Sequence, residues 1–128
     1  MTDIIQTIER YGIIPVINVP EEKDAEPLAH ALAKGGLPLI EVTMRHEKAI
    51  NCLHRISQSC PFVMVGAGSI LSVQAAQEAI AAGADFIVAP GLQPEVVRYC
   101  LAQGVPIFPG CATATEITAG RELGLKTF

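Results

Sequence analysis

The feature that most constrains the fold is a regular alternation of short apolar runs with helical segments. Five runs are continuous rather than alternating in polarity and rich in β-branched residues, and their centres lie 20 to 25 residues apart. Such runs are typical of strands that are buried on both faces of a parallel sheet. The centres are Val16, Glu41, Val65, Val88 and Phe108. One more step of similar length reaches Phe128, so "KTF" (126–128) is expected to begin a sixth strand.

Helical segments separate the predicted strands. They cover residues 21–36, 46–59, 72–84, 93–104 and 113–124, after a leading amphipathic helix over 1–12. Four of them close on a glycine that can adopt the left-handed C-cap conformation. These glycines are Gly35, Gly83, Gly104 and Gly124. In the last segment "TATE" (113–116) predicts a capping box, in which Glu116 satisfies the start of the helix.

Two architectures use this alternation: an open, doubly wound sheet and the closed (β/α)8 TIM barrel. No G-x-G-x-x-G follows the first strand, and the units have nearly constant length, which favours the barrel. Residues 1–128 are expected to be a single domain, made of an N-terminal helix and about five and a half βα units. So few units cannot close a barrel and would leave apolar strand edges without partners. The chain is therefore expected to be the N-terminal part of a longer barrel.

Composition and charge exclude several classes of function. A formal net charge of −4 with no cluster of Lys or Arg predicts no nucleic-acid partner and no membrane-surface partner. No apolar stretch approaches the length of a membrane span, and residues 1–12 lack the pattern of a signal peptide. The cysteine spacing matches no zinc or redox motif, and no His/Asp/Glu grouping has metal-ligand spacing. We expect no metal site, and four buried thiols in a cytoplasmic protein. The cysteines are Cys52, Cys60, Cys100 and Cys111.

The second predicted strand carries charged residues inside an apolar run. Alternation places Glu41 and Arg45 on one face and Ile40 and Val42 on the other. The apolar face suits packing against helices, so Glu41 and Arg45 are expected to face the barrel axis. Arg45 ends the strand, at the side where barrel active sites are built. A desolvated carboxylate has a raised pKa, which suits a group that both accepts and donates protons. The alternatives are a structural ion pair or a poorly covered sheet edge.

The next three strands end in loops that are expected to line the mouth of the barrel. "GAGS" (66–69) allows the backbone to approach a ligand closely, and Ser69 offers a hydroxyl and a helix N-cap. An ordinary tight turn explains this motif equally well. The fourth strand ends in "APG", where Pro90 fixes the rim, and the fifth ends in "FPGC".

Five motifs in this order and spacing resemble a known family. They are "IEVTMR" (40–45), "VGAGSIL" (65–71), "GADFIVAPG" (83–91), "IFPGCATATE" (107–116) and "ELGLKTF" (122–128). Over essentially the whole chain they resemble the 2-keto-3-deoxy-6-phosphogluconate (KDPG) aldolases, a family that includes 4-hydroxy-2-oxoglutarate (KHG) aldolases. The resemblance implies a cytoplasmic, cofactor-free class I aldolase on a TIM barrel, usually a homotrimer, in Entner–Doudoroff-type sugar-acid breakdown. Its small-molecule keto-acid substrate would be cleaved to pyruvate and either glyceraldehyde 3-phosphate or glyoxylate.

The resemblance also implies roles for individual residues. Glu41 matches the carboxylate that shuttles protons, and Arg45 matches the residue that binds the pyruvoyl carboxylate. Ser69 stands where the family generally has Thr and would hydrogen-bond the same carboxylate. Pro90 matches a residue that lines the pocket. A further departure is Ala114, in place of a frequent Pro.

The nucleophile implied by the resemblance is a lysine that forms a Schiff base with the substrate. In the family it follows a Phe in a run like F-K-F-F-P, so here it is expected at the position after Phe128. Lys126 is rejected because it comes too early, at the entry of the sixth strand and toward the end of the barrel opposite the mouth. Two alternatives stay open. The 128 residues could be a non-catalytic fragment or assembly module, or part of another barrel enzyme, such as an epimerase or synthase, that acts on a phosphorylated small molecule.

Overall fold

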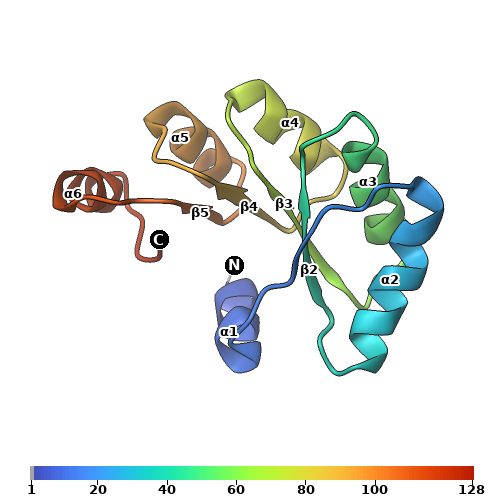
Figure 1. Cartoon of the computed structure of the whole chain (residues 1–128). Helices are drawn as coiled ribbons and strands as arrows, with labels where there is room; N and C mark the ends of the chain where they lie inside the picture. Colours follow the sequence, from blue (N-terminus) through green and yellow to red (C-terminus); the bar gives the residue numbers. More distant parts are fainter. Residues whose placement is uncertain (1) are drawn as a thin grey trace.

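A computed structural model describes residues 2–128 as strands and helices that alternate after a leading helix (Figure 1). The strands are β1 (Val16–Ile17), β2 (Leu39–Thr43), β3 (Met64–Gly68), β4 (Phe86–Ala89) and β5 (Ile107–Pro109). The helices are α1 (Thr2–Tyr11), α2 (Glu22–Lys34), α3 (Ala49–Ser59), α4 (Val73–Ala81), α5 (Pro94–Ala102) and α6 (Ala114–Glu122). Each of the five strands contains its predicted centre, so this part of the prediction is confirmed.

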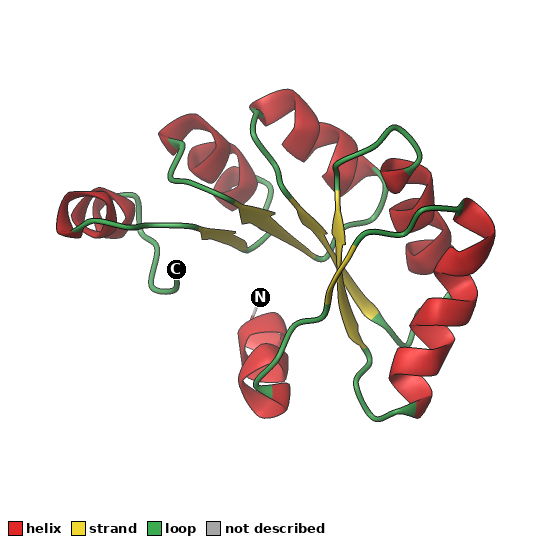
Figure 2. Ribbon diagram, in the orientation of Figure 1, coloured by secondary structure: helices red, strands yellow, loops and turns green. Residues whose placement is uncertain are grey.

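The five strands form one parallel sheet in the order β1-β2-β3-β4-β5. Glu41 of β2 lies opposite Val16 of β1 and Gly66 of β3. Figures 1 and 2 show α2 to α6 in an arc around one side of this curved sheet, with α1 on the open side. A doubly wound sheet reverses its strand order and carries helices on both faces. The observed order therefore excludes that architecture, and the chain has a singly wound α/β fold.

The main core lies between the sheet and the surrounding helices. Ile40 and Val42 of β2 and Val65 of β3 belong to one buried cluster with Leu53 and Ile56 of α3. Each such side chain stabilises the fold by about 1.5–3 kcal/mol when it is fully buried. The predicted division of β2 into an apolar face and a face that carries Glu41 is thereby confirmed.

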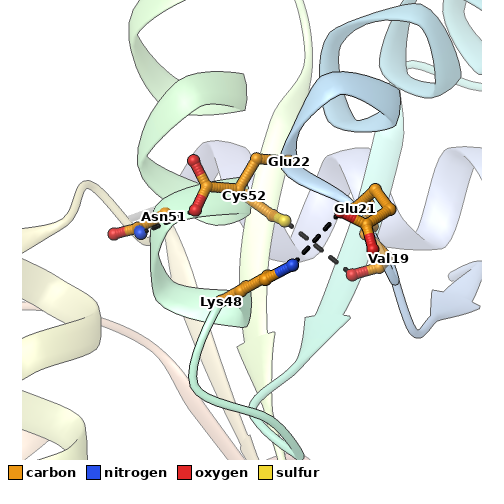
Figure 3. A network of polar contacts seen from close by, with 6 residues as sticks. All are labelled: Val19, Glu21, Glu22, Lys48, Asn51 and Cys52. Atoms are coloured by element: carbon orange, nitrogen blue, oxygen red, sulfur yellow. Dashed lines mark hydrogen bonds and ion pairs between the residues drawn. The ribbon is translucent and has the colours of Figure 1, made fainter.

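The segments that follow β1 and β2 lie side by side at the carboxyl end of the sheet (Figure 3). Lys48 Nζ donates a hydrogen bond to Glu21 Oε2 at 3.2 Å, and the Cys52 thiol lies 3.8 Å from the carbonyl oxygen of Val19. The ion pair is exposed, so solvent screens it and it contributes little stability. The contact through Cys52 is buried. Together they hold the start of α3, and with it the loop that contains Arg45, beside the start of α2.

The expectation of four buried thiols is wrong for one of them. Cys52, Cys60 and Cys100 are buried, but Cys111 is half-buried because it lies in the loop after β5 and not in a helix that faces the core. All four are free thiols. Burial raises the pKa of the Cys100 thiol to about 11, so this group stays neutral near pH 7.

Helix α2 has 13 residues, well below the roughly 20 that cross a bilayer. Over residues 2–128, no helix combines the length and the apolar character of a membrane span.

The predicted sixth strand is not formed. Residues 125–128 are not part of the sheet, and the Phe128 ring lies against Gly120 of α6, in the space that a Cβ atom there would occupy. Because Gly120 has no side chain, the ring can pack onto the helix, and the segment follows α6 instead of pairing with β5. The contact with Gly120 is a tertiary contact, which the composition of the run does not encode.

One predicted C-cap is also displaced by a residue. Gly83, Gly104 and Gly124 adopt positive φ angles of 101°, 72° and 94°, as predicted. Gly35 has a helical φ of −74°, and the following Gly36 takes the left-handed conformation with φ of 87°. Either residue of a Gly-Gly pair can end a helix, so composition alone does not select one.

The capping box at the start of α6 is confirmed. The Thr113 hydroxyl accepts a hydrogen bond from the Glu116 backbone N–H at 3.2 Å, and the Glu116 carboxylate accepts one from the Thr113 N–H at 2.9 Å. The Glu116 carboxylate also accepts a hydrogen bond from the Ala112 N–H at 2.7 Å, and this bond, together with those from Thr113, lowers the pKa of Glu116. We expect Thr113→Ala to lower the free energy of unfolding by about 1 kcal/mol in urea titrations. The exposed Thr115→Ala is the control, and equal losses in the two variants would contradict a capping role.

Candidate active site

The concave side of the sheet holds a cavity of about 610 Å³. Four strands supply side chains to it from their inward faces: Val16, Glu41, Val88 and Phe108. Helix α1 adds Glu9, and Phe128 reaches the cavity from the end of the chain. Glu41 is thus a carboxylate in a largely apolar surround. Its lining includes residues of both edge strands, β1 and β5.

Glu41 is strongly desolvated, with only 6% of its surface exposed. Burial raises the pKa of its carboxyl group, and the positive charge of Arg45 opposes that rise to a smaller extent. The two ion pairs found over residues 2–128 lie on exposed faces of α2 and α3, and neither involves Glu41 or Arg45. A structural ion pair therefore does not explain Glu41. Burial thus favours the neutral form of this carboxyl group, the direction that suits a group that both accepts and donates protons.

This raised pKa makes stability depend on pH in a defined direction. The folded protein binds the Glu41 proton more tightly than the unfolded chain does. The stability that this tighter proton binding contributes is complete below about pH 4.3, the ordinary pKa of Glu in an unfolded chain. It is lost as the pH rises through the pKa of Glu41 in the folded protein. Gln mimics the neutral acid, so Glu41→Gln should have a higher Tm than the wild type at pH 7 and an equal Tm at a pH below about 4. Thermal scans at the two pH values test this, with the exposed Glu95→Gln as control. A Gln variant less stable than the wild type at pH 7 would contradict it.

The ladder of backbone hydrogen bonds continues past the carboxyl ends of the strands. Each rung joins a residue just after one strand to the end of its neighbour. The rungs are Met44 N–H to Gly68 O at 2.9 Å, Ile70 N–H to Val88 O at 3.2 Å and Gly110 N–H to Ala89 O at 2.9 Å. Because these rungs are parallel and in register, the residues beside them lie at one edge of the sheet.

The predicted binding residues Arg45, Ser69 and Pro90 all lie at this carboxyl edge. Arg45 follows the first rung and is exposed, which leaves its guanidinium free to meet an anion from solvent. Ser69 is half-buried between the second rung and the end of β3. Pro90 is exposed, and its carbonyl contacts Gly110 in the next loop. Of the four predicted site residues, Glu41 lines the cavity, whereas the other three are not among its lining residues.

Ser69 does not cap the following helix, contrary to the expectation. Helix α4 is capped by Ser72, whose hydroxyl accepts a hydrogen bond from the Ala75 N–H at 3.1 Å. Ser69 is the residue other than glycine that has a positive φ, 62°, in the described part of the chain. This conformation turns the chain sharply after β3, so the helix starts further on. Such backbone conformations are costly and cluster at functional sites.

Sequence reasoning missed most of the lining residues, among them Glu9 and Phe108. Phe108 was identified as a strand centre, and its alternation with the buried Ile107 could have placed it on the inward face. Glu9 has no such signal, because the position of α1 under the sheet does not follow from any local pattern.

Lys126 and Phe128 lie in different hollows. Lys126 lines another cavity of about 310 Å³, whose lining also includes Leu101 of α5 and Ile5 of α1. Phe128 lines the same cavity as Glu41. Within residues 2–128, no three His, Cys, Asp or Glu side chains are grouped so that they could hold a metal ion.

The protein is a singly wound α/β protein in which the desolvated Glu41 carboxylate faces a largely apolar cavity. The side chains of Arg45 and Ser69 follow strands β2 and β3 at the carboxyl edge of the sheet. The model of the family "KDPG and KHG aldolase" matches residues 4–128. The chain belongs to this aldolase family.

A curated relative is the 2-dehydro-3-deoxy-phosphogluconate aldolase of Treponema pallidum, which is 47% identical over 126 residues. The match covers 98% of this chain and 60% of the relative. The chain thus spans about three-fifths of that protein's length. The named relatives are aldolases, which are carbon–carbon lyases.

Two solved structures have the same fold. The KDPG aldolase of Zymomonas mobilis ZM4, crystallised with 3-phosphoglycerate, has a TM-score of 0.90 at 34% identity, over 98% of this chain and 59% of that one. The KDPG aldolase of Legionella pneumophila, with pyruvate captured at low pH as a covalent carbinolamine intermediate, has a TM-score of 0.84 at 36% identity. That match covers 88% of this chain and 54% of the other.

Proposed function

We propose that the whole protein is a class I aldolase that cleaves a 2-keto-4-hydroxy acid to pyruvate and an aldehyde. The substrates are 2-dehydro-3-deoxy-6-phosphogluconate, 4-hydroxy-2-oxoglutarate or both. The observation that carries the proposal is the desolvated Glu41 carboxyl group, which faces the cavity of a chain that belongs to this aldolase family. The carbinolamine captured in the Legionella pneumophila relative is the adduct that an amine forms with a keto carbon, which is the first intermediate of this chemistry.

The chemistry needs one group that moves several protons. An amine adds to the C2 carbonyl and gives a carbinolamine, which takes up a proton and loses water to become an iminium ion. Loss of the C4 hydroxyl proton breaks the C3–C4 bond, which releases the aldehyde and leaves an enamine. Protonation at C3 and hydrolysis then release pyruvate and the free amine. Glu41 is the group that we assign to these transfers, because its carboxyl group faces the cavity and burial raises its pKa, the direction that suits a group that both donates and accepts protons.

The carboxyl edge supplies the binding groups. Arg45 binds the substrate carboxylate with its guanidinium fork, and the Ser69 hydroxyl donates a hydrogen bond to the same group. Pro90 forms part of the rim beside them. The two loops that carry Arg45 and Ser69 are joined by the rung from Met44 to Gly68, which keeps the two side chains on neighbouring strands.

The nucleophile that we propose is a lysine at the position after Phe128. Phe128 lines the cavity of Glu41, whereas Lys126 lines the separate hollow beside α5. A Schiff-base lysine needs a desolvated amine that faces the reacting carbon, which Lys126 lacks, since it is exposed.

We further propose that the sheet is the first part of an eight-stranded TIM barrel, in a cytoplasmic homotrimer that takes part in Entner–Doudoroff metabolism. The sequential parallel order of the five strands supports the barrel, because a doubly wound sheet would reverse it.

The assay that tests the function is pyruvate release from the two keto acids, followed by coupled reduction of pyruvate to lactate. Release of pyruvate from neither acid by the purified whole protein would overturn the proposal.

A further inference from the structure

The glycines of β3 on the concave face lie beside Glu41. Gly66 is the direct partner of Glu41 across the β2–β3 pair, and Gly68 is the partner of Thr43. The Glu41 side chain is long enough to reach along the strand, past its direct partner, to Gly68. A Cβ atom added at Gly68 would overlap the Glu41 carboxylate oxygen Oε1 and would lie 2.6 Å from Cδ and 2.9 Å from Cγ. The carboxylate thus occupies the space that any side chain at Gly68 would fill.

Backbone conformation does not explain why residue 68 is glycine. The glycines with positive φ over residues 2–128 are Gly12, Gly36, Gly83, Gly104 and Gly124, all of them outside the strands. Gly68 lies within β3, where the extended backbone is open to any residue. Glycine weakens a strand interior, and one physical reason for it there is the close approach of another group. At Gly68 that group is the Glu41 carboxylate.

Gly66 and Gly68 differ in the side chain that lies against them. A Cβ atom at Gly66 would overlap the ring of Phe86, which is fully buried and lies edge-on to Phe108 with 6.0 Å between the ring centroids. That ring has no free space to move into, so a methyl group at Gly66 strains the core. The Glu41 carboxylate is the far end of a flexible side chain beside an open cavity, so it can move aside.

We propose that Gly68 is a positioning residue for Glu41, and that its bare backbone forms a socket that holds the carboxylate against the sheet. The inference rests on the proposed function, since it assigns to Gly68 the placement of the group that moves protons in that reaction. The raised pKa of Glu41 fits this arrangement, because the socket keeps the carboxyl group out of water. A carboxylate displaced into the cavity is better hydrated, and its pKa should fall toward the ordinary value.

The first test is Gly68→Ala in the whole protein. We expect kcat for pyruvate release to fall by roughly 100-fold, because a displacement of about 1 Å of a catalytic group costs that much. KM should change little, since Arg45 and Ser69 are untouched. The acidic limb of the pH profile should move to lower pH. The control is Gly35→Ala, a glycine-to-alanine change at a helical φ of −74° far from the cavity.

The second test is rescue by a shorter carboxylate. Glu41→Asp removes one methylene group, which draws the carboxylate back from the methyl group that Gly68→Ala introduces and lessens the overlap. We expect the Gly68→Ala/Glu41→Asp double variant to be at least 10-fold more active than the product of the two single effects predicts. A 10-fold difference corresponds to a coupling free energy of about 1.4 kcal/mol. Strictly multiplicative effects would overturn the socket. If Gly68→Ala alone does not fold, the double variant should fold, and failure of both to fold would also overturn it.

Failure of the socket and failure of the proposed function can be told apart. A wild type that releases no pyruvate overturns the proposed function. The socket is then tested by carboxyl carbon NMR, with the Glu41 signal assigned by its loss in Glu41→Gln. A pKa for Glu41 that is lower in Gly68→Ala than in the wild type supports the socket. An unchanged Glu41 titration, or an unchanged pH profile in an active protein, overturns it.

Discussion

Replacing Glu41 with Gln in the whole protein is expected to lower kcat for pyruvate release by about 100- to 10,000-fold, the range of general acid–base catalysis. Gln occupies the same volume on the concave face but can neither donate a carboxylic proton nor accept one. Binding should persist, because Arg45 and Ser69 at the rim are unchanged, so KM should shift much less than kcat. Steady-state kinetics with each keto acid measure the two parameters separately.

The same kinetics need a control for the loss of a carboxylate as such. Glu95→Gln removes an exposed carboxylate from α5 and should leave both parameters near their wild-type values. A Glu41→Gln enzyme within about threefold of the wild type would remove Glu41 from the proton-transfer role, since general acid–base catalysis contributes at least about 100-fold. It would favour another barrel enzyme that handles a phosphorylated small molecule.

Replacing Arg45 with Gln is expected to raise KM by about 10- to 100-fold, with a smaller change in kcat. A hydrogen bond between charged partners contributes about 1.5–3 kcal/mol, and Arg45 is placed to bind the substrate carboxylate with such bonds. The charge of Arg45 also lowers the pKa of Glu41, in opposition to burial. The acidic limb of the pH profile should therefore move to higher pH in Arg45→Gln, opposite to the shift expected for Gly68→Ala.

Arg45→Lys separates the two effects of the arginine. Lysine keeps the positive charge but lacks the planar fork, so KM should rise while the pH profile stays near that of the wild type. The exposed Arg98→Gln on α5 is the matched control for a lost guanidinium. An Arg45→Gln protein with an unchanged KM would show that another group binds the carboxylate.

The sequence predicted the parts of the fold that repeat and the parts that alternate. The continuous apolar runs centred on Val16, Glu41 and Phe108 identified the strands, because a buried parallel strand requires such a run. Alternation along β2 placed Glu41 opposite the helix-packed Ile40 and Val42, and with it predicted the burial that raises its pKa. These features follow from the repeat of the apolar runs and from the alternation of side chains within one strand.

The features that sequence reasoning did not predict depend on tertiary contacts and backbone angles that composition does not specify. The "KTF" segment has the composition of a strand, but Phe128 packs against Gly120 of α6 instead of extending the sheet. Ser69 has the composition of a helix cap, but its positive φ moves the helix start to Ser72. The contact between Gly68 and Glu41 appears only when β2 and β3 are paired in register.

The most direct test of the proposed chemistry is borohydride reduction of the whole protein in the presence of pyruvate, followed by peptide mass mapping. We expect one stable adduct, on a lysine at the position after Phe128, and none on Lys126 or on the helical Lys23, Lys34 and Lys48. Lys126→Met should leave the adduct unchanged. An adduct on Lys126 would contradict the assignment of the nucleophile. The absence of any adduct would contradict the Schiff-base mechanism and favour a non-catalytic role for the chain.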